Sequence, residues 1–130
     1  RKFSDRPIVV RGHPGDKKVP LYLQLDEPNV IISPWKKPIV QDLQNAWAVV
    51  TYNSSPGVVS LIEGIPVFAM DPDPNYSQYH HVSNTTLKRL EDPKMFDRQN
   101  WIESLAMCHW KFEELRSGEA WEFMRNYVRQ

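Results

Sequence analysis

Residues 51–57 combine small polar side chains with a helix start, and this combination is suited to binding phosphate. Asn53, Ser54 and Ser55 follow an apolar run, and Gly57 lies two residues further on. Serine hydroxyls and free backbone N–H groups at a helix start can donate hydrogen bonds to an anion. Gly57 leaves room for a ligand to approach. The alternative is that the serines only cap the helix, as serine often does.

A second polar segment, residues 11–18, also follows an apolar run. Arg11 offers a planar fork of donors for phosphate or carboxylate, and His13 can donate to a phosphate or transfer a proton. The lysines of this segment are more typical of a solvated turn. Because ligands bind at the carboxyl ends of parallel strands, we expect Arg11 and His13 to face the same cleft as residues 53–57.

A third segment, residues 71–81, contains two aspartates and the adjacent pair His80 and His81. Neighbouring histidines do not easily bind one ion, and the ligand spacing typical of helical metal sites is missing. We therefore expect no metal here. The segment is interpreted instead as a proline-stiffened loop that lines the ligand cleft.

Apolar runs bounded by turn residues predict the strands that position these segments. They cover residues 7–11, 29–33, 47–52 and 66–70. Their lack of clean alternation is typical of parallel strands covered on both faces. Helical spacing predicts helices over residues 38–46 and 55–63, with Gly64 ending the second. Residues 21–25 fit a strand or a short helix equally well.

This alternation of strands and helices predicts an α/β fold, a Rossmann-like parallel sheet flanked by helices. A C-terminal helical tail, residues 97–130, follows. It comprises an amphipathic helix over residues 97–115, capped by Asp97, and a second helix after the break at Ser117-Gly118. We expect residues 1–130 to form a single domain in which the apolar side of the tail packs on the sheet or contacts an absent partner domain.

Composition narrows the class of protein. The 130 residues are 41% hydrophobic and 25% charged, and 16 basic residues balance 16 acidic ones. This balance gives no general attraction to nucleic acid. No apolar run approaches the ~20 residues of a transmembrane segment. The single cysteine, Cys108, is expected to be a core residue and fits a cytoplasmic location. The start at Arg1 rather than Met suggests a fragment.

Two segments resemble a known family. Arg11-Gly12-His13-Pro14 resembles the Arg-Xaa-His-Pro element of capsule-polysaccharide-type and related GT-B glycosyltransferases. Residues 53–67 resemble their Asn-Ser-Ser/Thr-Xaa-Gly segment, which ends in Gly-Xaa-Pro-Val. Order, spacing and strand context agree over roughly residues 7–75.

The resemblance implies the C-terminal, donor-binding half of such an enzyme. Asn53, Ser54 and Ser55 would hold the phosphate or sugar of a nucleotide-sugar donor, and Arg11 and His13 would face the same cleft. The donor is a substrate, and no cofactor or metal is implied. The general base usually lies in the other half, so no catalytic residue is assigned. The partner would be a missing N-terminal Rossmann-like half, or the chain would self-associate.

Two alternatives remain open from the sequence. Many relatives carry a glutamate that binds the nucleotide ribose where this chain has Val59. This departure favours a non-catalytic Rossmann-like binding or scaffold domain. A half of a UDP-sugar epimerase-like enzyme shares both the Arg-Xaa-His-Pro element and the architecture.

Overall fold

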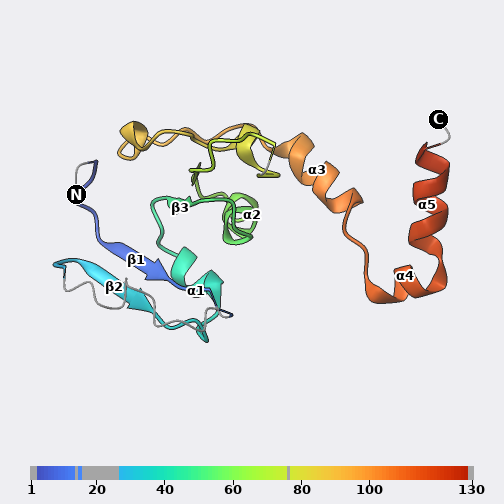
Figure 1. The fold of residues 1–130 in the computed structure, drawn as a ribbon, viewed down its shortest axis with the longest axis horizontal. Helices are drawn as coiled ribbons and strands as arrows, with labels where there is room; N and C mark the ends of the chain where they lie inside the picture. The colour runs from blue at the N-terminus through green and yellow to red at the C-terminus, as the bar shows by residue number, and fades with distance from the viewer. Residues whose placement is uncertain (1–2, 14, 16–26, 76, 129–130) are drawn as a thin grey trace. The chain divides into compact units, whose positions relative to one another are not determined.

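The computed structural model describes residues 3–13, 15, 27–75 and 77–128 (Figure 1). The chain divides into two compact units, Arg1–Phe96 and Asp97–Gln130, called the N-terminal and C-terminal units below. The division falls where the sequence predicted the helical tail to begin. The undecided residues 21–25, and the lysines of the 11–18 segment, lie outside the described residues.

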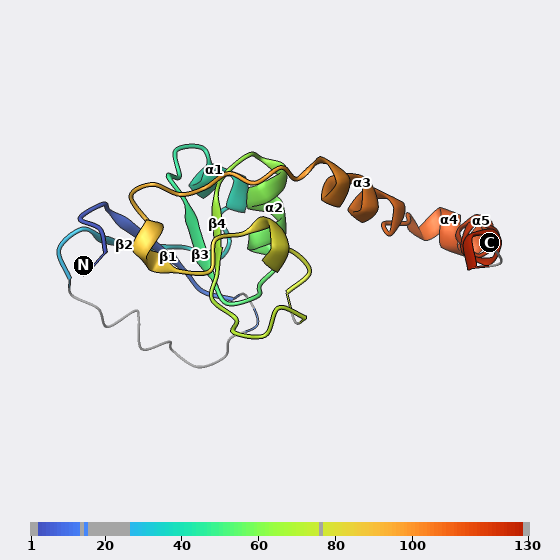
Figure 2. The same cartoon turned by 90° about the horizontal axis from the view of Figure 1, so that it is seen from above.

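The strands of the N-terminal unit form parallel ladders. β1 (Ile8–Arg11) pairs with β2 (Val30–Ser33), and β3 (Val49–Thr51) pairs with β4 (Val67–Ala69). Figure 2 shows the second pair side by side. All four strands lie within the runs predicted to be strands. In the described residues the ladders are separate, so the fold is α/β with small parallel sheets.

Asn84 extends the second ladder on the side of β4 that faces away from β3. Asn84 N–H donates to the Val67 carbonyl oxygen over 2.8 Å, and Ala69 N–H donates to the Asn84 carbonyl oxygen over 2.9 Å. The Asn84 side chain also makes two hydrogen bonds with the backbone of Lys94. Its Nδ2 donates to the Lys94 carbonyl oxygen, and its Oδ1 accepts from Lys94 N–H. β4 is therefore paired on both sides, and all of its residues are buried.

Two short helices follow β2 and β3, as the sequence predicts. α1 (Ile39–Leu43) begins after Pro38. α2 (Pro56–Ile62) has proline in its first turn and packs against β3 and β4. Gly64, with a φ of 81°, lies in the left-handed region just beyond α2 and ends it. The 3₁₀ helices η2 (His80–Val82) and η3 (Leu87–Arg89) lie beyond β4.

The core of the N-terminal unit surrounds β4. Its buried side chains include Leu61, Val67, Phe68, Tyr79 and Val82. By contrast, Val9 and Ile31, which are register neighbours on β1 and β2, are 49% and 56% exposed. The prediction that all four strands are covered on both faces is therefore wrong. The described helices of this unit are short, and α2 packs on the β3–β4 ladder.

The C-terminal unit contains α3 (Gln99–Met107), α4 (Phe112–Ser117) and α5 (Glu119–Val128). Asp97 Oδ1 accepts a hydrogen bond from Gln99 N–H over 3.1 Å, which supports the start of α3. Gly118, with a φ of 86°, separates α4 from α5 at the predicted break.

The predicted continuous helix over residues 97–115 is wrong, because residues 108–111 interrupt it. His109 Nδ1 lies 2.6 Å from the carbonyl oxygen of Leu105, which is one of the last acceptors of α3. Lys111 N–H donates to the Glu114 carboxylate over 2.7 Å, which starts the next helix. Cys108 falls in this break and is exposed, so its predicted core position is also wrong.

Candidate functional site

The segment between β3 and α2 keeps its serine hydroxyls free. Ser54 and Ser55 are exposed, and within the described residues neither hydroxyl makes a hydrogen bond. Ser55 occupies the N-cap position, but its side chain does not cap α2. The alternative in which these serines only cap the helix is therefore not what the structure shows. Both hydroxyls are available to a ligand.

Asn53 is held in place by the segment that follows the neighbouring strand, β4. Its Nδ2 donates to Asp71 Oδ2 over 2.9 Å, and Asp71 Oδ1 accepts from Asp73 N–H over 3.0 Å. Asp71 follows β4 and is only 5% exposed. This contact joins the segments that leave the carboxyl ends of β3 and β4, where ligands bind in parallel sheets.

Tyr79 holds the next residue of the same segment. The phenol is fully buried and donates to the Ser54 carbonyl oxygen over 2.7 Å. Burial, assisted by the charge of Asp71, raises the pKa of Tyr79, although the hydroxyls of Ser77 and Thr51 act in the opposite direction. The phenol is therefore a protonated donor throughout the physiological range.

Gly57 is required by packing against the same ring. A Cβ at Gly57 would lie 2.5 Å from Tyr79 Cζ, closer than non-bonded carbon atoms approach each other. The tyrosine ring fills the space beside Gly57 that was predicted to admit a ligand. Tyr79 therefore contacts residues on both sides of Ser55, namely the Ser54 carbonyl oxygen and Gly57.

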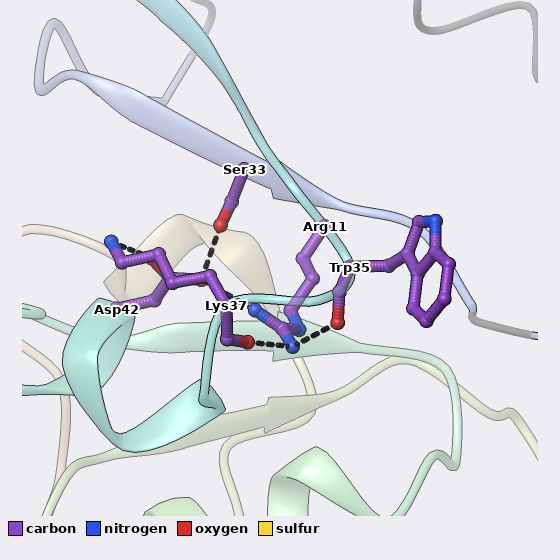
Figure 3. A network of polar contacts seen from close by, with 5 residues as sticks. All are labelled: Arg11, Ser33, Trp35, Lys37 and Asp42. Carbon is purple, nitrogen blue, oxygen red and sulfur yellow. Dashed lines mark hydrogen bonds and ion pairs between the residues drawn. The ribbon is translucent and has the colours of Figure 1, made fainter.

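Arg11 is placed in a different set of contacts (Figure 3). Its guanidinium donates to Asp42 Oδ2 over 2.9 Å and to the Trp35 carbonyl oxygen over 2.9 Å, and also to the Lys37 carbonyl oxygen. The indole of Trp35 points away from this network. Arg11 therefore ties the end of β1 to the segment between β2 and α1.

Asp42 is the acceptor at the centre of this network. Besides Arg11, it accepts from Ser33 Oγ over 2.6 Å and from Lys37 Nζ. Burial acts to raise the pKa of Asp42, but hydrogen bonds from Lys37, Ser33 and Arg11 together outweigh it and lower the pKa. The network carries two cations and one carboxylate, which leaves one net positive charge beside the carboxyl ends of β1 and β2.

His13 is exposed, and its ring orientation is set locally. Its Nδ1 accepts from Gly15 N–H over 3.0 Å. In a neutral imidazole the proton then lies on Nε2, which makes that nitrogen a donor. No hydrogen bond or ion pair between described residues joins Arg11 or His13 to the segment of residues 53–57.

Sequence reasoning placed residues 71–81 at the ligand cleft but did not predict that Asp71 and Tyr79 hold the 53–57 segment. The contact of Tyr79 with Ser54 spans 25 positions of the sequence, so no local pattern indicates it. Among the described residues, no group of three His, Cys, Asp or Glu side chains is arranged to hold a metal ion.

No helix of the described residues is long and apolar enough to cross a membrane. Comparison with family models, with curated proteins and with solved structures found no match to this chain.

Proposed function

We propose that this chain is the nucleotide-sugar-binding half of a glycosyltransferase, which moves a sugar from an activated nucleotide to a glycan or another hydroxyl acceptor. One observation carries the proposal. The hydroxyls of Ser54 and Ser55 are exposed and unused, while the residues around them are held by Asp71 and Tyr79. Donors carried on a backbone that is already held in place stabilise a departing phosphate at a smaller cost of reorganisation.

In this proposal Ser54 and Ser55 donate to the diphosphate of the donor. His13, whose Nε2 is free to donate, is a second phosphate contact. Arg11 acts by organising the ends of β1 and β2, because its guanidinium is bound by internal acceptors. The parallel pairs support a Rossmann-like nucleotide-binding half. The general base belongs to a second half.

A non-catalytic binding domain is the second candidate, and the Arg11 network favours it. A guanidinium engaged by Asp42, Trp35 and Lys37 contributes less to neutralising a leaving phosphate than a free one. Val59 stands where many enzymes of the resembled glycosyltransferase group carry a ribose-binding glutamate, and this difference also favours a binding domain. Both candidates share the nucleotide site and differ in whether the bound sugar is transferred.

The test is a thermal-unfolding screen with UDP, GDP, CDP, CMP and UDP-GlcNAc. A ligand that binds only the folded state raises the unfolding temperature, and the shift grows with the logarithm of the ratio of ligand concentration to dissociation constant. We expect a shift with one nucleotide that is reduced in Ser54→Ala and Ser55→Ala. Ser104→Ala, an exposed serine on α3, is the matched control and should shift like the wild type.

The outcomes separate the candidates. A shift that is equal in all three serine variants places the nucleotide elsewhere, and the absence of any shift from the folded wild type overturns the proposal. Where a nucleotide sugar binds, incubation with a hydroxyl acceptor and the proposed second half distinguishes a transferase from a binding domain, because only a transferase glycosylates the acceptor. Release of free nucleotide indicates transfer or hydrolysis.

A further inference from the structure

The contact with Asp71 decides which way the Asn53 amide faces. A primary amide has one oxygen that accepts and two N–H groups that donate, whereas a carboxylate only accepts. Asn53 must therefore turn Nδ2 toward Asp71 Oδ2, at the observed 2.9 Å. Within the described residues the Asn53 side chain makes no other hydrogen bond, so Oδ1 and one N–H remain for a ligand.

The remaining Asn53 oxygen favours a ligand group that can donate a hydrogen bond. The oxygens of a nucleotide diphosphate linkage carry no proton at neutral pH and only accept, so they cannot satisfy Oδ1. The Asp71 carboxylate directly behind the amide further disfavours an anion at this position, because like charges repel. A hydroxyl both donates and accepts, and it therefore matches the oxygen and the N–H together.

We propose that Asn53 reads a ligand hydroxyl, on the sugar or on the ribose, and that Asp71 is the positioning residue that fixes this specificity. The phosphate contacts then belong to the neighbouring serines, whose hydroxyls are free to donate. This inference rests on the proposed nucleotide-sugar site and divides it into a hydroxyl-reading part and a phosphate-binding part.

The test compares ligands that differ in the groups they offer. Calorimetric titration measures the affinities of inorganic pyrophosphate, UDP, 2′-deoxy-UDP and UDP-glucose for the wild type and for Asn53→Ala. If the screen selects GDP, the set becomes pyrophosphate, GDP, 2′-deoxy-GDP and GDP-mannose. Asn45→Ala, an exposed asparagine beyond α1, is the matched control. Thermal unfolding without ligand verifies that each variant folds.

Loss of one hydrogen bond to a ligand hydroxyl lowers affinity about threefold to tenfold. We expect Asn53→Ala to show this loss with UDP-glucose and none with pyrophosphate. A loss that also appears with UDP, but not with 2′-deoxy-UDP, assigns the hydroxyl to the ribose. A loss confined to UDP-glucose assigns it to the sugar. Either pattern supports the inference.

Asp71→Asn is the second variant, because it lets the Asn53 amide turn over and removes the negative charge. We expect the affinity for UDP-glucose to fall relative to that for pyrophosphate. An equal loss of pyrophosphate and UDP-glucose binding in Asn53→Ala, or no loss with any ligand, overturns the inference while the nucleotide site stands. A wild type that binds none of these ligands overturns the proposed function and the inference with it.

Discussion

The hydroxyl of Tyr79 donates a hydrogen bond to the carbonyl oxygen of Ser54 over 2.7 Å. The same oxygen accepts from Gly57 N–H over 2.9 Å, so it receives both a side-chain donor and the backbone of the first helical turn. In a trans peptide the N–H of the next residue points away from this carbonyl oxygen. Tyr79 therefore fixes the orientation of the Ser54–Ser55 peptide from inside the core.

Replacing Tyr79 with phenylalanine tests this contact. The ring and its packing remain, while the donor to Ser54 is lost, so we expect a loss of about 0.5–1.5 kcal/mol in the free energy of unfolding. Urea unfolding measures it. Tyr127→Phe, on the exposed side of α5, is the matched control and should stay within about 0.5 kcal/mol of the wild type. Equal effects in both variants would count against the contact.

Gly57→Ala is expected to be destabilising because its methyl group would overlap the Tyr79 ring. Overpacking of this kind costs about 1–3 kcal/mol. If the overlap with the ring is the cause, Gly57→Ala should destabilise the protein less when the Tyr79 ring is absent. A double-mutant cycle with Tyr79→Leu measures that coupling by urea unfolding. Additive losses in the double variant would show that the glycine is required for another reason.

The Asp42 network predicts a specific pH dependence of stability. The pKa of Asp42 in the folded state lies below its ordinary value of 3.8. Protonation therefore favours the unfolded state, and the stabilising contribution of the ionised carboxylate is complete well above pH 3.8. It is lost as the pH falls through the lower, folded-state pKa.

Asp42→Asn should accordingly be less stable than the wild type at pH 7, by about 1–2 kcal/mol, and the difference should shrink below pH 3.8. Urea unfolding at several pH values measures both. Asp92→Asn, whose side chain is 93% exposed, provides the matched control and should change stability by at most about 1 kcal/mol. A difference between wild type and Asp42→Asn that is independent of pH would contradict the prediction.

Substitution of Arg11 should lower the stability of the unliganded protein, whereas substitution of Ser54 should leave that stability unchanged. Arg11→Ala removes donors to Asp42, Trp35 and Lys37 and should lower the stability of the unliganded protein by about 1–3 kcal/mol. Arg11→Lys should rescue little, since an ammonium group does not reproduce the planar fork. Ser54→Ala should leave the unliganded protein within about 0.5 kcal/mol of the wild type.

Thermal and urea unfolding without ligand measure this contrast between the two residues. If Arg11→Ala leaves stability unchanged and abolishes nucleotide binding, then Arg11 contacts the ligand directly and the structural role described here is wrong.

Local patterns in the sequence were sufficient to place the strands and the first helices. β-branched runs bounded by turn residues predicted β1 to β4, and Pro56 and Gly64 predicted where α2 begins and ends. These signals depend on neighbouring residues, whose backbone preferences act within a few positions. The same patterns failed over residues 97–115, where competing local hydrogen bonds at His109 and Lys111 interrupt a regular apolar spacing.

The sequence by itself also determined which residue types stand at the carboxyl ends of the strands, and so the candidate site. Only the tertiary structure decided how they are used. Asp71 and Tyr79 reach Asn53 and Ser54 across 18 and 25 positions, and Arg11 turns to Asp42 across 31. The physical reason is that a buried donor or acceptor must find a partner wherever the packed chain provides one. Such partners lie far apart in the sequence, so a local sequence pattern does not predict them.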